Sequence, residues 1–190
     1  MWQDELRKIW NSAHALDDEV WKKFLTCWRK EKTLKRNEFL DEPGKIEDTL
    51  YFVKSGAMRL YYPMEEEEIC VGFAYPPSLI CSYPSFISQQ PSAYFIQALR
   101  ETELMGISRK DFYNLMLHNI SIERAWRILQ EKALLGKIER ETELLTFTPE
   151  QRVNRLLQRS PHLFQIIPRK YIASYLRMTP ETLSRLNLKY

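Results

Sequence analysis

The strongest constraint on the fold is a change in the spacing of apolar residues near Ser108. Upstream of it, short runs of aromatic and β-branched residues alternate with turn residues, a pattern typical of β-strands. Five such runs lie at residues 50–54, 58–62, 69–73, 94–100 and 103–107. Downstream, apolar residues recur three and four positions apart, which predicts helices. Because many short strands joined by turns favour a sandwich, we predict an α+β chain with an N-terminal β-sandwich followed by helices.

The first thirty residues are also predicted to be helical. Asp17 is suited to cap a helix, and apolar side chains continue at helical spacing from Val20 to Trp28. Between two of the predicted strands, the segment Pro63–Glu68 ends in four glutamates and is predicted to form a solvated hairpin tip. Four glutamates without a nearby histidine or aspartate make a poor metal cage, so we expect no metal site there.

A long segment without proline, from about residue 121 to residue 145, is predicted to be a single helix. At the usual rise per residue it would be about 36 Å long. Five residues alternate four and three positions apart and form a heptad seam: Ile122, Trp126, Leu129, Ala133 and Gly136. The seam predicts that two copies dimerise along this helix. The alternative is a helix packed only on its own β domain.

Charge is distributed unevenly along the chain. Residues 149–190 carry eight basic and two acidic side chains, whereas the rest of the chain carries 20 basic and 23 acidic ones. A basic module joined to a slightly acidic one indicates that the C-terminal part meets a polyanion.

The same C-terminal part meets the spacing constraints of a helix-turn-helix. Thr148 and Gln151 form a capping box before a first helix, and Pro168 and Pro180 open two shorter helices. With Arg169 as position one, the small Ala173 stands at position five, where the two helices cross. The apolar positions 4, 8, 10, 15 and 18 are Ile172, Leu176, Met178, Leu183 and Leu186. Position nine departs from the pattern, because Arg177 stands where a left-handed backbone favours glycine.

In this geometry the second helix enters the DNA major groove with its N-terminal residues leading. Side chains expected to contact bases are Thr179, Glu181, Thr182, Ser184 and Arg185, with Arg185 suited to guanine and Glu181 to cytosine. Side chains expected to hold phosphates are Arg169, Lys170, Arg177 and Lys189. The alternative is an ordinary pair of surface helices with scattered arginines.

A β-sandwich, one long helix and a C-terminal helix-turn-helix together resemble the Crp/Fnr family of bacterial transcription regulators, over essentially the whole chain. The stretches 50–56, 86–92 and 170–176 are similar to those of short members typical of Bacteroidetes, and residues 178–185 look like the recognition-helix signature. The resemblance implies a jelly-roll, cyclic nucleotide-binding-like domain at 1–120, a dimerisation helix at 121–147 and a winged-helix-type helix-turn-helix at 148–190. Because the sequence stops at Tyr190, we expect no DNA contacts from a wing.

The family's usual contacts to a cyclic nucleotide are missing from the matching stretches. Residues 75–82 contain neither the glycine nor the glutamate of the family's pattern, and Pro91-Ser92 replaces its arginine step. Because a buried phosphate without a cation is very costly, we expect no cyclic AMP binding in the usual mode. An apolar effector pocket is a further hypothesis, lined by Phe73, Tyr75, Tyr83, Phe86 and Tyr94. The alternative is that these aromatics are plain core, which is the more common role of such residues.

Other functional classes find no support in the sequence. The five glycines lie too far apart for a phosphate-binding loop, and the three histidines are scattered, so we expect neither an enzyme nor a cofactor. The three cysteines indicate no disulfide framework or zinc site, and no apolar run is long enough to cross a bilayer. We therefore expect a cytoplasmic homodimer that binds double-stranded DNA and responds, if at all, to a small-molecule effector. Two alternatives are a small-molecule binding protein with a relic helix-turn-helix and a module that docks an acidic protein.

Overall fold

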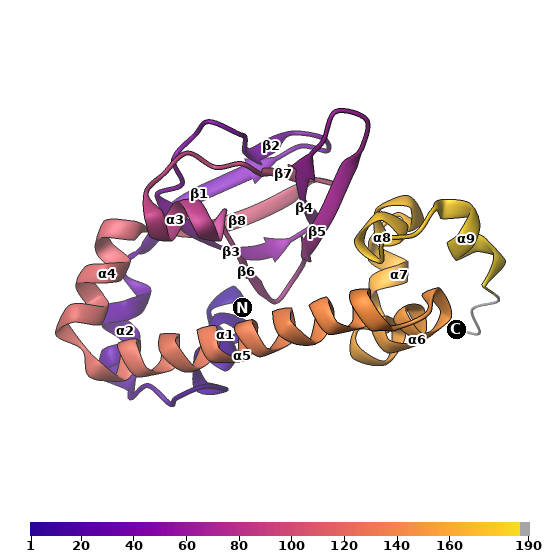
Figure 1. Cartoon of the computed structure of the whole chain (residues 1–190). Coiled ribbons are helices and arrows are strands. Elements are labelled where there is room, and N and C mark those ends of the chain that lie inside the picture. Colours follow the sequence, from indigo (N-terminus) through magenta and orange to yellow (C-terminus); the bar gives the residue numbers. More distant parts are fainter. Residues whose placement is uncertain (187–190) are drawn as a thin grey trace.

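The computed structural model describes residues 1–186 and contains two four-stranded antiparallel sheets packed as a sandwich (Figure 1). The first sheet has the strand order β1-β8-β3-β6 and the second β2-β7-β4-β5. The strands are β1 (Trp28–Leu34), β2 (Phe39–Asp41), β3 (Thr49–Ser55), β4 (Met58–Pro63), β5 (Glu68–Ala74), β6 (Ser78–Ile80), β7 (Phe95–Ala98) and β8 (Thr102–Ser108). The predicted sandwich is confirmed.

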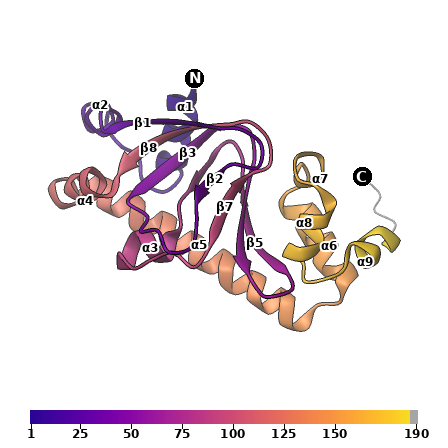
Figure 2. The ribbon, with the colours of Figure 1, turned by 90° about the horizontal axis from the view of Figure 1, so that it is seen from above.

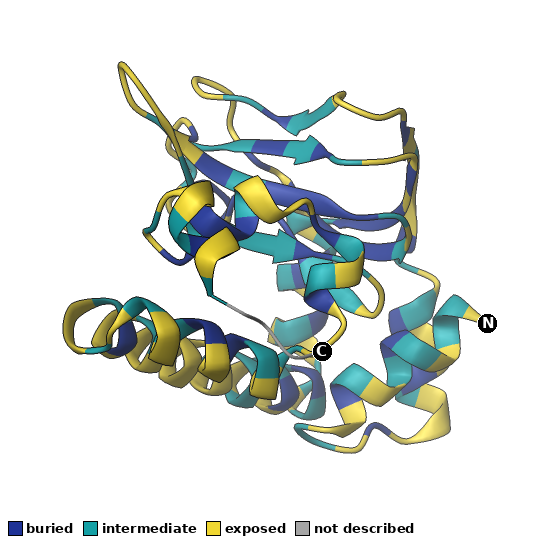
Figure 3. Ribbon diagram, turned by 90° about the vertical axis from the view of Figure 1, so that its right-hand side faces the viewer, coloured by how far each residue is buried: buried dark blue, intermediate teal, exposed yellow. Residues whose placement is uncertain are grey.

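Apolar side chains from both sheets fill the space between them. Val53 and Leu104 of the first sheet and Met58 and Ile96 of the second are all essentially inaccessible to solvent. Buried residues gather in the strands of the sandwich, whereas exposed residues lie on the loops and on the outer sides of the helices (Figure 3). Gly56 makes the tight turn between β3 and β4 with φ of +93°, and an added Cβ would collide with the Glu101 carbonyl oxygen. Only glycine adopts this backbone without strain and leaves that space free.

Helices cover the outer side of the first sheet and then lead away from it. They are α1 (Trp2–Asn11), α2 (Asp18–Leu25), α3 (Tyr83–Ser88), α4 (Arg109–His118) and α5 (Ile120–Thr146). Asp17 caps α2 through its side chain, as predicted, and Ser108 caps α4 in the same way. The predicted helix up to residue 30 is wrong at its end, because Trp28 opens β1. In that strand only Trp28 and Leu34 are buried, so charged residues hide the alternation.

The long helix lies within one residue of its predicted bounds, but its inner face differs from the predicted dimer seam. Ile122 is 1 % exposed, and Trp126 and Leu129 are partly buried in the same apolar cluster. The Trp126 ring stacks on Trp10 of α1 with centroids 5.9 Å apart. The prediction that Ile122 faces a partner copy is therefore wrong, because the N-terminal helices of its own chain cover it. Ala133 and Gly136 are exposed.

Four short helices form the C-terminal part and share a core with the sandwich. They are α6 (Pro149–Arg159), α7 (Leu163–Ile166), α8 (Arg169–Tyr175) and α9 (Pro180–Arg185). The capping box of Thr148 and Gln151 at the start of α6 is confirmed. Ala57, between β3 and β4, is fully buried in the cluster that these helices form. Figure 2 shows α6–α9 beside β5, at the far end of α5 from α4.

Candidate nucleic-acid interface

The crossing of α8 and α9 has the residue pattern of a helix-turn-helix. Ala173 is completely buried where a small side chain is required, and Ile172, Leu176 and Leu183 are each at most 4 % exposed around it. Met178 and Leu186 are partly buried against the same cluster. The five apolar positions and the small position predicted from the sequence are therefore confirmed as core.

The turn between the two helices also has the predicted backbone. Arg177 has φ of +54°, the left-handed conformation in which a side chain costs free energy relative to glycine. Thr179 then caps α9, because its hydroxyl accepts a hydrogen bond from the Thr182 amide at 3.2 Å. These two residues fix the direction in which α9 leaves the turn.

The N-terminal part of α9 is open to solvent. Thr179, Glu181, Ser184 and Arg185 are exposed, and Thr182 is half-buried. Among the residues expected to hold phosphates, Arg169, Lys170 and Arg177 are exposed. Lys189 lies outside the described residues. The arrangement thus presents base-contacting candidates on one short helix, with cationic side chains on α8 and in the turn that precedes α9.

Strand β5 packs against α8, a contact that the sequence did not reveal. The Ser174 hydroxyl accepts a hydrogen bond from the Cys70 amide and donates one to the Glu68 carbonyl oxygen, each at 2.9 Å. Arg177 forms an ion pair with Glu67 at 3.4 Å. The prediction of a solvated hairpin tip is therefore only partly correct, because two of its glutamates face the helix-turn-helix. In the sequence, the run of four glutamates and the basic C-terminal module were the features that could have indicated this contact.

Arginines from the sandwich and from α5 hold the C-terminal helices in place. Arg59 is 4 % exposed and lies between the rings of Tyr61 and Tyr171, at 4.0 and 4.2 Å from their centroids. Its guanidinium also pairs with Glu68 at 2.5 Å. Arg140 of α5 donates to the Tyr175 carbonyl oxygen at 2.9 Å. Because guanidinium groups both stack and donate, these contacts fix the orientation of α8.

The five aromatics expected to line an effector pocket do not come together. Phe73 and Tyr75 pack against the C-terminal helices, with Phe73 5.3 Å from the Tyr175 ring. Phe86 is fully buried below α4, Tyr83 lies 6.3 Å from the Trp126 ring, and Tyr94 contacts Tyr62. The predicted pocket is wrong, because strand alternation and α3 send these side chains into different clusters.

Two buried acidic residues lie beside residues 75–82 and 91–92, the stretches that match the family's cyclic nucleotide contacts in position. Ser82 and Ser92 are hydrogen bonded to each other through their hydroxyls at 2.7 Å. Asp41 and Glu47 are 3 % and 7 % exposed, and one Asp41 oxygen has no hydrogen-bond partner among the described residues. Burial raises the pKa of Glu47 to about 7, and the nearby Asp41 charge contributes. Burial also raises the pKa of Asp41.

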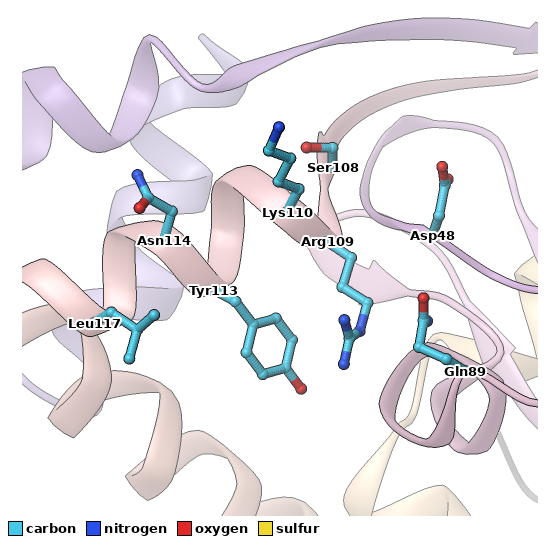
Figure 4. A pocket seen from close by; sticks show the side chains of 8 residues that line it. All are labelled: Asp48, Gln89, Ser108, Arg109, Lys110, Tyr113, Asn114 and Leu117. Carbon is cyan, nitrogen blue, oxygen red and sulfur yellow. The ribbon is translucent and has the colours of Figure 1, made fainter.

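A separate cavity of about 410 Å³ opens between α3 and α4 (Figure 4). Arg109 reaches into it, but its guanidinium is engaged by the Phe86 carbonyl oxygen at 2.7 Å and by the Tyr113 ring at 4.4 Å. The side chain therefore fastens α3 to α4. Within residues 1–186, no helix is both long and apolar enough to cross a bilayer, and no three potential metal ligands cluster.

Comparisons with known proteins agree with the overall fold. Residues 31–119 match the model of the cyclic nucleotide-binding domain, which covers the sandwich and α4 but not α5–α9. None of the curated proteins matches the chain by sequence.

Solved structures share the fold over most of the chain. FixK2 from Bradyrhizobium japonicum has a TM-score of 0.69 at 20 % identity, covering 83 % of this chain and 81 % of its own. The c-di-GMP responsive global regulator CLP of Xanthomonas campestris has 0.68 at 18 %, covering 90 % and 89 %. The Thermus thermophilus catabolite activator protein has 0.59 at 23 %, covering 91 % and 83 %. The chain therefore has a sandwich that matches the cyclic nucleotide-binding domain, within a fold similar to that of these three proteins.

Proposed function

We propose that the protein is a cytoplasmic transcription regulator that binds double-stranded DNA as a homodimer. The observation that carries the proposal is the helix-turn-helix, in which a buried Ala173 and a left-handed Arg177 position α9 with its N-terminal residues exposed. Arg185 would read guanine and Glu181 cytosine, while Arg169, Lys170 and Arg177 would bind phosphates. The shared fold with a global regulator supports this reading.

The outer face of α5 is the surface we propose for dimerisation. Leu134, Leu135, Ile138 and Leu145 are between 51 % and 78 % exposed on the half of α5 beyond the N-terminal helices. The spacing from Leu135 to Ile138 and on to Leu145 is three and seven, as in a heptad seam. Exposed apolar side chains in such a row favour a second copy of the same helix as the partner. A dimer would place two α9 helices in successive major grooves, about 34 Å apart.

The sandwich is proposed not to hold a cyclic nucleotide in the usual mode. Asp41 and Glu47 are buried beside Ser82 and Ser92, where the resemblance would require a cation for the phosphate. A phosphate buried beside these carboxyl groups would lack the arginine of the family's pattern, which Pro91-Ser92 replaces, and burying it without a cation is costly. An effector of this protein would therefore be a different small molecule.

Fluorescence anisotropy tests the proposal directly. Duplexes tiling the DNA upstream of the protein's own gene are compared with scrambled duplexes near physiological salt, with and without cyclic AMP. We expect sequence-selective binding that is indifferent to cyclic AMP. Selective binding that requires cyclic AMP would contradict the proposal for the sandwich. Ligand affinity without any DNA affinity would favour a small-molecule binding protein with a relic helix-turn-helix.

A further inference from the structure

We propose that the β4–β5 hairpin holds the helix-turn-helix in a state that cannot bind DNA, with its glutamates standing in for DNA phosphates. The inference rests on the DNA-binding function proposed above. It concerns how one part of the chain regulates another, and it predicts that DNA binding requires the hairpin to leave α8.

The hairpin lies against the cationic side chains that would hold phosphates. Glu67 and Glu68 share a groove of about 480 Å³ with Lys170 and Arg177. The Glu67 carboxylate is 3.4 Å from the Arg177 guanidinium. A carboxylate is an anionic acceptor like a phosphate, so it satisfies the same guanidinium. In this structure, the Arg177 guanidinium is therefore paired with a carboxylate of its own chain.

The same groove includes residues expected to touch bases. Thr179 and Glu181, at the start of α9, line it together with the hairpin. Double-stranded DNA carries one negative charge for about every 1.7 Å of its axis. A duplex approaching this end of α9 would meet Glu67 and Glu68, which line the same groove. Steric overlap and like-charge repulsion therefore both act against DNA.

Neutral contacts keep the hairpin in register with α8. Ser174 bonds to the backbone of β5 on both sides of Ile69, at the Glu68 carbonyl and the Cys70 amide. Phe73, further along β5, packs on Tyr175 with ring centroids 5.3 Å apart. The ion pair of Glu67 is thus the outermost part of a continuous contact.

The ionic part of the contact lies at the solvent and is reversible. The side chains of Arg177 and Glu67 are 45 % and 56 % exposed, so water and salt screen their attraction. Glu181 lines the same groove as the two hairpin glutamates and carries the same charge. If α8 moved away from β5, Arg177 would lose its partner Glu67, and the groove that these two residues share with Lys170 would open to a duplex.

The test uses a matched pair of charge reversals in the full chain and a random-sequence duplex. Glu67→Lys removes the contact and repels Arg177. Glu65→Lys makes the same change of charge at the hairpin tip, where Glu65 forms no ion pair or hydrogen bond with α8 or α9 within residues 1–186. Because exposed pairs contribute up to about 1 kcal/mol, we expect Glu67→Lys to bind about fivefold more tightly than Glu65→Lys. Equal affinities would overturn the proposal.

A second variant and a second readout separate this inference from the proposed function. Ser174→Ala keeps every charge but removes both hydrogen bonds to β5, and it should also bind the duplex more tightly than the wild type. Hydrogen exchange of residues 68–74 should be faster in Glu67→Lys than in Glu65→Lys. Unchanged exchange would overturn the docking itself. Faster exchange without any DNA binding by any of these proteins would instead defeat the DNA-binding function, and the inference with it.

Discussion

Glu47 and Asp41 are two carboxyl groups whose charged form is disfavoured by burial in the folded protein. Glu47 is 7 % exposed, and its carboxylate oxygen accepts a hydrogen bond from the Thr49 amide at 3.0 Å. This bond favours the charged form, but desolvation outweighs it and raises the pKa to about 7. The protonated form is therefore the one that fits the sandwich.

Glu47→Gln is expected to stabilise the protein at pH 8 and to have little effect at pH 4.5. Because the folded-state pKa lies above the unfolded value, the wild type loses stability as pH rises from about 4.5 to about 7. The neutral amide removes this loss, which amounts to at most about 3 kcal/mol. Urea unfolding at both pH values measures it. Glu65→Gln, at an exposed position, should show no such dependence, and equal effects at both pH values would contradict the assignment.

Ala173→Leu is expected to destabilise the helix-turn-helix and abolish DNA binding. Ala173 is 0 % exposed at the crossing of α8 and α9, and added methylene groups in a packed site cost about 1–3 kcal/mol. Urea unfolding and DNA anisotropy measure the two effects. Ala93→Leu is the control, because Ala93 is exposed. Equal stability of the two variants would show that the crossing tolerates bulk.

Helix α5 has three kinds of surface along its length. Its first turns are buried by α1. Near its end, Glu143 is 6 % exposed and pairs with Arg155 and Arg159 of α6. Its outer face is apolar and open to solvent. The two ends of the helix thus fix the sandwich and the helix-turn-helix to one element. A rotation of α5 would be transmitted to both.

Ile138→Glu is expected to convert a dimer into a monomer at micromolar concentration. Ile138 is 51 % exposed at the centre of the outer face of α5. In the proposed dimer, the introduced glutamate would lie close to the same glutamate of the partner copy, and the two charges would repel each other. Sedimentation velocity measures the association state. Leu117→Glu makes the same change on α4, where Leu117 is 82 % exposed, and should leave the dimer intact. A wild type that sediments as a monomer would contradict the dimer.

Across the whole molecule, the sequence predicted what depends on local constraints. The caps at Asp17 and Thr148, the buried Ala173 and the left-handed Arg177 each follow from a few neighbouring residues, and all are confirmed. Heptad spacing at Ile122 could not distinguish a partner copy from the chain's own helices. Cys27 and Trp28 continue a helical pattern, yet α2 ends at Leu25 and β1 begins at Trp28.

Long-range contacts were the part that the sequence could not predict. The contact between Ser174 and β5 joins residues about a hundred positions apart, and no local pattern encodes it. The five aromatics of the predicted pocket lie in different clusters for the same reason. Alternation along a strand determines the face of the sheet to which a side chain points, but not the apolar cluster that it joins. In the folded chain, the acidic β4–β5 hairpin nevertheless contacts the basic helix-turn-helix.

The most direct test of base reading by α9 compares Arg185→Ala with Arg169→Ala on a selected duplex and on its scrambled counterpart. The account predicts that Arg185→Ala loses about 1–3 kcal/mol on the selected duplex and little on the scrambled one. Arg169→Ala, as a phosphate contact, should weaken binding to both duplexes alike. An equal loss on both duplexes for Arg185→Ala would contradict the account.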